Sequence, residues 1–164
     1  MPRILNQSRR LVAAAMLVAA TGMLSAQARL LPQVEVSSGG ALEMLPSLAI
    51  EGQWLIVSVA PSSPPSARLL QALTAWEIES RTARLLIVAE GVTDARPLAE
   101  AWSERLPGAR WVADPTNAIA RSMNLRGAPM VFGVRNQEIV WVLAGVLNDP
   151  AMLRDAATSW LANP

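Results

Sequence analysis

Two serine side chains, Ser63 and Ser66, have a spacing in this chain that could support chemistry. They flank Pro64 and Pro65, two residues after the apolar residues 54–60, so the four residues form a turn that opens a helix. A serine at a helix N-terminus can act as a nucleophile or hold an anion, because the helix dipole favours negative charge there. A nucleophilic serine needs a nearby base, however, and the sequence contains no His and no Lys. We therefore favour Ser63 as an N-cap, with Pro64 as the first helical residue.

The residue types that are missing exclude several classes of chemistry. The chain has no Cys and no His, so it lacks the ligands of zinc sites, haem groups and iron–sulfur clusters, and it cannot form a disulfide. All 14 basic residues are Arg, and without Lys there is no Schiff-base chemistry. A glycine-rich phosphate loop is also absent from the sequence. We expect neither a metal nor a cofactor.

Three charged positions have both a functional and a structural interpretation. Arg126 lies just before Gly127-Ala128-Pro129 and could contact an anion, although such arginines are more often solvated. Asp114 and Asp149 could be catalytic carboxylates. Each precedes a proline at an expected helix start, however, which indicates helix capping rather than acid–base catalysis.

The first 28 residues have the three parts of a secretory signal peptide. A positive start with three Arg precedes the apolar residues 11–24, and Ala26-Gln27-Ala28 fits the small-x-small cleavage pattern. Cleavage after Ala28 removes those three Arg and leaves 11 Arg against 13 acidic residues, a net charge of −2. We therefore expect a periplasmic protein with no nucleic-acid partner, which would meet a membrane only through an uncleaved signal segment.

Apolar runs and cap signals predict alternating strands and helices around the serine turn. We expect strands at 54–60, 85–89, 110–113, 130–134 and 138–146, the last two forming a hairpin. Helices are expected to begin at Pro64, at Thr93 or Asp94, at Asp114-Pro115 and at Asp149-Pro150. Residues 29–50 form a leader, with a short strand at 33–36, that packs on a domain at 51–164. This pattern predicts an α/β fold with a sheet covered by helices on both faces.

The order and spacing of these elements resemble the thioredoxin superfamily, and most of all the secreted thiol–disulfide oxidoreductases of the TlpA and ResA type. In that family an apolar strand ends at a turn, often Cys-Pro-Pro-Cys, and here Ser63-Pro64-Pro65-Ser66 stands in its place. Gly127-Ala128-Pro129 matches the family's G-x-P, whose proline is cis and lies against that turn. The resemblance implies a thioredoxin-like fold with a central mixed sheet. Residues 61–64 are also similar to the thioredoxin-like accessory proteins of methylamine dehydrogenase maturation.

Three features of the family's active site are missing together. Both redox cysteines are serines, the tryptophan that usually precedes the first cysteine is Ser62, and the polar residue six positions before that cysteine is Val57. We therefore expect no thiol–disulfide exchange by this chain.

The leading hypothesis is an exported, non-catalytic binding module that assists the assembly or maturation of another exported protein. A client segment would lie along the groove formed by Ala128-Pro129 and by Ser62, Ser63, Pro64, Pro65 and Ser66, because partners of thioredoxin-like folds pair with backbone beside the cis proline. Pro129 is equally well interpreted as a retained structural turn. The alternative is an enzyme or sensor in which Ser63 holds the thiolate of an external thiol such as glutathione. A third interpretation is a structural remnant whose groove binds nothing.

Overall fold

The computed structural model describes residues 29–75, 83–145 and 150–162. The expected signal peptide, residues 1–28, and Asp149, the expected cap of the last helix, lie outside the described residues. None of the helices in the described part is long and apolar enough to cross a membrane.

The described part of the chain forms one eight-stranded sheet with the order β1-β8-β7-β4-β5-β6-β2-β3. The strands are β1 (Arg29–Leu30), β2 (Glu35–Ser38), β3 (Ala41–Met44), β4 (Gln53–Val59), β5 (Ala83–Glu90), β6 (Arg110–Asp114), β7 (Met130–Arg135) and β8 (Glu138–Ala144). The helices are α1 (Leu45–Leu48), α2 (Pro64–Ala75), α3 (Arg96–Trp102), α4 (Ala118–Ser122) and α5 (Pro150–Leu161).

The central strand β4 has different neighbours on its two sides. It pairs in parallel with β5 and antiparallel with β7, while β7 and β8 form the predicted hairpin. Every residue of β4 is buried, as its largely apolar sequence predicts for a strand covered on both faces. The mixed sheet expected from the sequence is confirmed.

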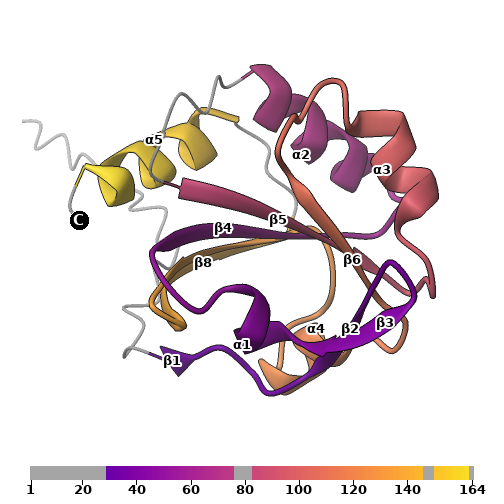
Figure 1. The fold of residues 1–164 in the computed structure, drawn as a ribbon. Helices are drawn as coiled ribbons and strands as arrows, with labels where there is room; N and C mark the ends of the chain where they lie inside the picture. The colour runs from indigo at the N-terminus through magenta and orange to yellow at the C-terminus, as the bar shows by residue number, and fades with distance from the viewer. Residues whose placement is uncertain (1–28, 76–82, 146–149, 163–164) are drawn as a thin grey trace, which may run out of the picture.

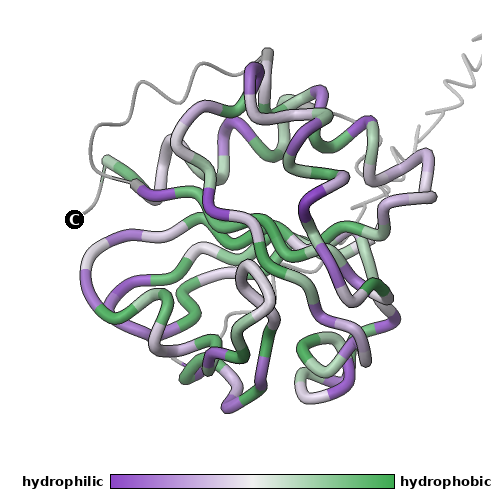
Figure 2. Tube along the Cα trace, turned by 45° about the vertical axis from the view of Figure 1, so that its right-hand side comes forward, coloured by the Kyte–Doolittle hydropathy of each residue, from purple (hydrophilic) through white to green (hydrophobic). Residues whose placement is uncertain are grey.

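Helices cover both faces of this sheet, as predicted (Figure 1). Successive residues of a strand point to opposite faces, so each strand supplies two cores. Leu55 and Val57 belong to the core beneath α2, α3 and α5, whereas Ile56 belongs to the core beneath α1 and α4. Figure 2 shows the apolar residues concentrated along the central strands, with most of the hydrophilic residues on the loops and the outer sides of the helices.

Two of the predicted helix starts are wrong, each for a local reason. The helix expected from Thr93 or Asp94 begins at Arg96, because the Asp94 carboxylate accepts the N–H of Arg96 (2.9 Å) in a tight turn before it. The helix expected from Asp114-Pro115 begins at Ala118. Asp114 is still the last residue of β6, and the chain turns after it through Asn117, whose φ of 53° lies in the left-handed region.

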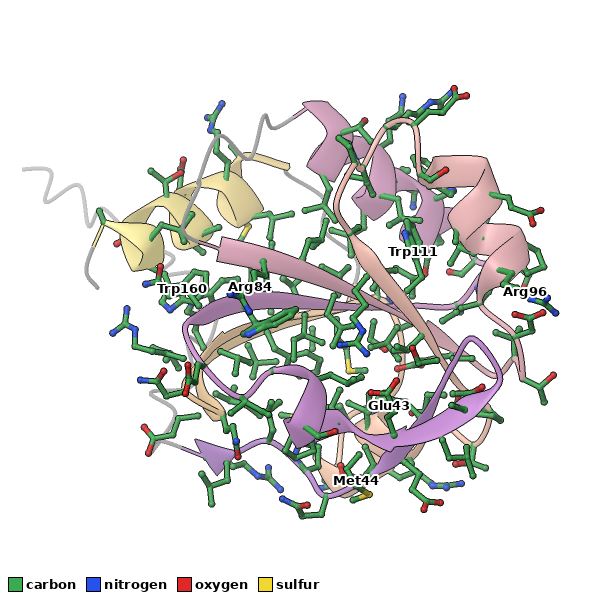
Figure 3. The ribbon with its side chains drawn as sticks, in the orientation of Figure 1. Glu43, Met44, Arg84, Arg96, Trp111 and Trp160 are labelled. Carbon is green, nitrogen blue, oxygen red and sulfur yellow. The ribbon has the colours of Figure 1, made fainter. Side chains whose placement is uncertain are left out.

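The leader contains more regular structure than the short strand expected at 33–36. β2 and β3 form a hairpin around Gly39 and Gly40, whose positive φ angles (59° and 93°) suit a tight turn. This hairpin extends the sheet beyond β6, while β1 pairs with β8 at the opposite edge (Figure 1). On β3, the Glu43 carboxylate accepts hydrogen bonds from Arg110 of β6 (Nη2 to Oε2, 3.1 Å; Figure 3).

Candidate functional site

The serine turn connects the end of β4 to the start of α2, as predicted. Ser63 donates its backbone N–H to the carbonyl of Ala60 (3.0 Å), and its own carbonyl accepts the N–H of Ala67 (3.1 Å). Ser63 therefore occupies the N-cap position, and the helix starts at Pro64. Its half-buried hydroxyl makes no hydrogen bond to any residue that the structure describes, so the backbone rather than the side chain forms this cap.

The second serine of the turn has a structural role. Ser66 is 2% exposed, and its Oγ accepts the N–H of Ala60 (3.0 Å). This bond joins the first turn of α2 to the residue that follows β4. The hydroxyl oxygen that stands where the family carries its second cysteine is thus buried and engaged with the backbone.

The two prolines between these serines remove backbone donors from the start of α2. The first N–H groups of a helix normally point outward and can hold an anion. Here Pro64 and Pro65 have no N–H, and the N–H of Ala67 is bonded to Ser63. Ser66 is the only one of these first four residues whose N–H remains for a ligand. A thiolate bound beside Ser63 would therefore find few donors.

Strand pairing brings the second candidate segment next to the turn. Ser58 of β4 pairs with Met130 of β7 as the last pair of this antiparallel ladder, so Ala128 and Pro129, just before β7, lie at the same edge of the sheet as the turn that follows β4. The Ala128–Pro129 peptide bond is cis, as the family resemblance implies. Ala128 is half-buried and Pro129 is buried, with the Pro129 carbonyl accepting the N–H of Gly145 (3.0 Å). Ala128 is thus the more accessible residue of this segment.

A buried carboxylate that the sequence analysis did not identify contacts this segment. Glu90, at the end of β5, is 6% exposed, and its Oε2 accepts the N–H of Ala128 (3.1 Å). Its Oε1 accepts the hydroxyl of Ser58 (2.5 Å), which is fully buried on β4. The signal in the sequence was Ser58 itself, because a lone polar side chain in an otherwise apolar strand needs a buried partner.

The remaining charged candidates have separate locations. Asp114 is fully buried, and its two carboxylate oxygens accept the N–H groups of Ala118 and Ile119 (both 2.9 Å). It caps α4, so its predicted capping role is confirmed although the helix begins later than expected. Arg126 is exposed and has no ion pair with another described residue. Across the described ranges, no three His, Cys, Asp or Glu side chains are grouped so that they could hold a metal ion.

No protein-family model and no curated protein matches the sequence. Several solved structures are similar to it in fold. One is a secreted Mycobacterium tuberculosis disulfide oxidoreductase homologous to E. coli DsbE, with 12% identity, 80% of this chain and 96% of that chain covered, and a TM-score of 0.60. An uncharacterised thioredoxin-like protein from Porphyromonas gingivalis has 22% identity, with 80% and 92% covered and a TM-score of 0.61.

A third similar structure, MTB DsbF in its mixed oxidised and reduced forms, has 15% identity, with 78% of this chain and 95% of that chain covered and a TM-score of 0.60. At these identities the likeness concerns the fold alone. The arrangement of the sheet, the helices on both faces and the cis Ala128–Pro129 bond agree with it. The chain therefore has a thioredoxin-like fold, and it contains no cysteine.

Proposed function

We propose that this protein is an exported, non-catalytic binding module that holds an extended segment of a client protein, as an accessory factor in that client's assembly or maturation. The groove is formed by Ala128-Pro129 and the turn residues 62–66. Export to the periplasm is supported by the signal-peptide pattern of residues 1–28, and one of the similar structures is a secreted protein.

The observation that carries this proposal is the state of Ser66. A reactive hydroxyl would have to be accessible and next to a base. Ser66 is instead buried and bonded through its oxygen to the backbone of Ala60. The nearby carboxylate, Glu90, is bonded to Ser58 and to Ala128. The turn is therefore built as a rigid part of the surface, which suits binding rather than catalysis.

The experiment is affinity capture from native periplasm with the wild-type protein and with the double variant Ser63→Arg/Ala128→Arg. A second double variant, Ala101→Arg/Ser103→Arg, is the matched control, because it makes the same two substitutions at exposed positions at the end of α3. We expect a client that the wild type and the control retain and the groove variant loses. Equal recovery by all three proteins would refute the proposal.

The alternative, an external thiol bound at Ser63, has less physical support. The prolines leave few N–H donors at the start of α2, and the N–H of Ala128 is already donated to the Glu90 carboxylate. An anionic thiolate would be repelled by that carboxylate. We therefore expect no heat in a calorimetric titration with reduced glutathione at millimolar concentration. A saturable binding heat that Ser63→Arg abolishes would reverse this preference.

A further inference from the structure

Ala128 and Pro129, the cis-proline segment, offer a partner strand only three main-chain hydrogen-bonding groups. They are the N–H and C=O of Ala128 and the C=O of Pro129, because proline has no N–H. Gly145 already donates to the Pro129 carbonyl (3.0 Å), and the Ala128 N–H already donates to Glu90 (3.1 Å). The Ala128 carbonyl alone has no partner among the described residues. A partner strand normally uses donors and acceptors together, but two of these three main-chain groups, including the only N–H, are already bonded within the fold.

Glu90 is firmly held in this position. Both of its oxygens accept a hydrogen bond, one from the buried hydroxyl of Ser58 (2.5 Å) and one from Ala128. Ser58 and Glu90 lie at the carboxyl ends of the adjacent parallel strands β4 and β5. The pairing of these strands therefore positions the Glu90 carboxylate next to Ala128.

The residue before Ala128 accommodates this contact. Gly127 has a φ of 104°, a conformation that suits glycine and strains other residues. A Cβ there would lie 3.8 Å from Oε2 of Glu90, an ordinary contact, so the backbone conformation rather than a lack of space favours glycine. The neighbouring carboxylate, Asp114, is paired with Glu90 across β5 and β6, but both of its oxygens are used by α4. Glu90 is therefore the carboxylate that the fold assigns to the cis-proline segment.

We propose that Glu90 is an internal competitor for the partner of this groove, an inference that rests on the proposed function. While its carboxylate holds the Ala128 N–H, a client strand can bond only to the Ala128 carbonyl. A client gains the second main-chain bond only by displacing Glu90. Glu90 thus lowers the affinity of the groove for extended segments in general. It selects clients whose side-chain contacts with the turn offset the loss of the Glu90–Ala128 hydrogen bond.

The experiment compares two variants that both remove the charge and the Ser58 hydroxyl. In Ser58→Ala/Glu90→Gln the amide oxygen can still accept the Ala128 N–H, whereas in Ser58→Ala/Glu90→Leu nothing accepts it. The probe is the cysteine-free extended peptide Ser-Val-Thr-Val-Ser-amide, labelled with fluorescein at its N-terminal amine and titrated by anisotropy with each full-length protein. Hydrogen exchange of the Ala128 amide, followed by NMR, reports the contact itself. Ser58→Ala/Glu90→Ala replaces the leucine variant if that variant does not fold.

We expect the leucine variant to bind the peptide about three- to tenfold more tightly than the glutamine variant and the wild type, the gain of one net hydrogen bond. Its Ala128 amide should also exchange faster in the absence of peptide. Equal or weaker peptide binding by the leucine variant, or an unchanged exchange rate, would overturn the inference. The proposed function fails by a different result, namely equal client recovery by the wild type and the Ser63→Arg/Ala128→Arg variant.

Discussion

Replacing Ser66 by Ala removes the acceptor that joins the start of α2 to the end of β4. The Ser66 Oγ accepts the N–H of Ala60 at 3.0 Å and is shielded from water, since the residue is 2% exposed. In the variant no hydroxyl accepts that N–H. Ser63, three residues earlier in the same turn, is the matched control because its hydroxyl bonds to no other described residue.

The size of the effect follows from the burial of the lost bond. Leaving a buried donor without a partner costs about 1 to 3 kcal/mol, and the partial burial of Ala60 places this case near the lower end. The higher helix propensity of Ala offsets up to about 0.5 kcal/mol of this loss. We therefore expect Ser66→Ala to lower the free energy of unfolding by about 1 kcal/mol, which corresponds to a Tm lower by about 4 °C. Ser63→Ala should change it by less than about 0.5 kcal/mol.

Urea denaturation and thermal unfolding of the two variants test this reasoning together. The informative result is which of the two variants loses more free energy of unfolding. If the Ser63 hydroxyl capped the helix, Ser63→Ala would lose more than Ser66→Ala. If Ser63→Ala proves as destabilising as Ser66→Ala, or more so, the structural assignment of the two hydroxyls is wrong. In that case the Ser66 hydroxyl does not fix the turn, and the turn is not the rigid binding surface proposed above.

Three further predictions concern other parts of the fold. Gly133→Ala should lower the free energy of unfolding by about 1 to 3 kcal/mol, because a Cβ there would overlap the indole of Trp141; unchanged stability in urea would contradict this packing. Asp114→Asn should cost about 1 to 3 kcal/mol, measured by thermal unfolding, because an amide can accept only one of the two N–H groups of α4 that the carboxylate now accepts; a neutral effect would show that α4 needs no such cap. The pKa of Asp94 is held below its ordinary value of 3.8, first by the side-chain hydrogen bond from Arg96. An NMR titration of Arg96→Ala should therefore show a higher pKa for Asp94 than in the wild type, and an unchanged pKa would refute the pairing. In the wild type, the small stabilisation from this exposed pair should be complete above pH 3.8 and lost as the pH falls through the lowered pKa.

The elements that the sequence predicted well are those encoded by local pattern. The largely apolar residues 54–60 and the two prolines after Ser63 determine a buried strand and a helix start without help from the rest of the chain. The start of α4 could not be found in this way. Asp114 before a proline fits both the end of a strand and the cap of a helix, and in the structure it is both. It pairs with Glu90 on β5, and its carboxylate accepts the first N–H groups of α4, which begins four residues later at Ala118.

The least predictable part of the candidate site was Glu90. In the sequence it simply ends an apolar run, and acidic residues at such places are usually solvated. Its partners lie 32 residues before it, at Ser58, and 38 residues after it, at Ala128. Only the strand order brings these three positions together. Hydrophobic periodicity indicates which side of a strand is buried, but it does not indicate which strand is the neighbour.

The placement of residues 29–44 has a consequence for solubility. β1 covers the outer side of β8, and the hairpin of β2 and β3 covers the outer side of β6, so one short stretch protects both edges of the sheet. The link between them passes through Leu31, which is buried in the core. Exposed strand edges pair readily with other chains. A single proteolytic cut after Leu31 would release β1 and uncover β8 while the β2–β3 hairpin stays in place, and its first sign would be self-association of the cleaved protein rather than loss of helix.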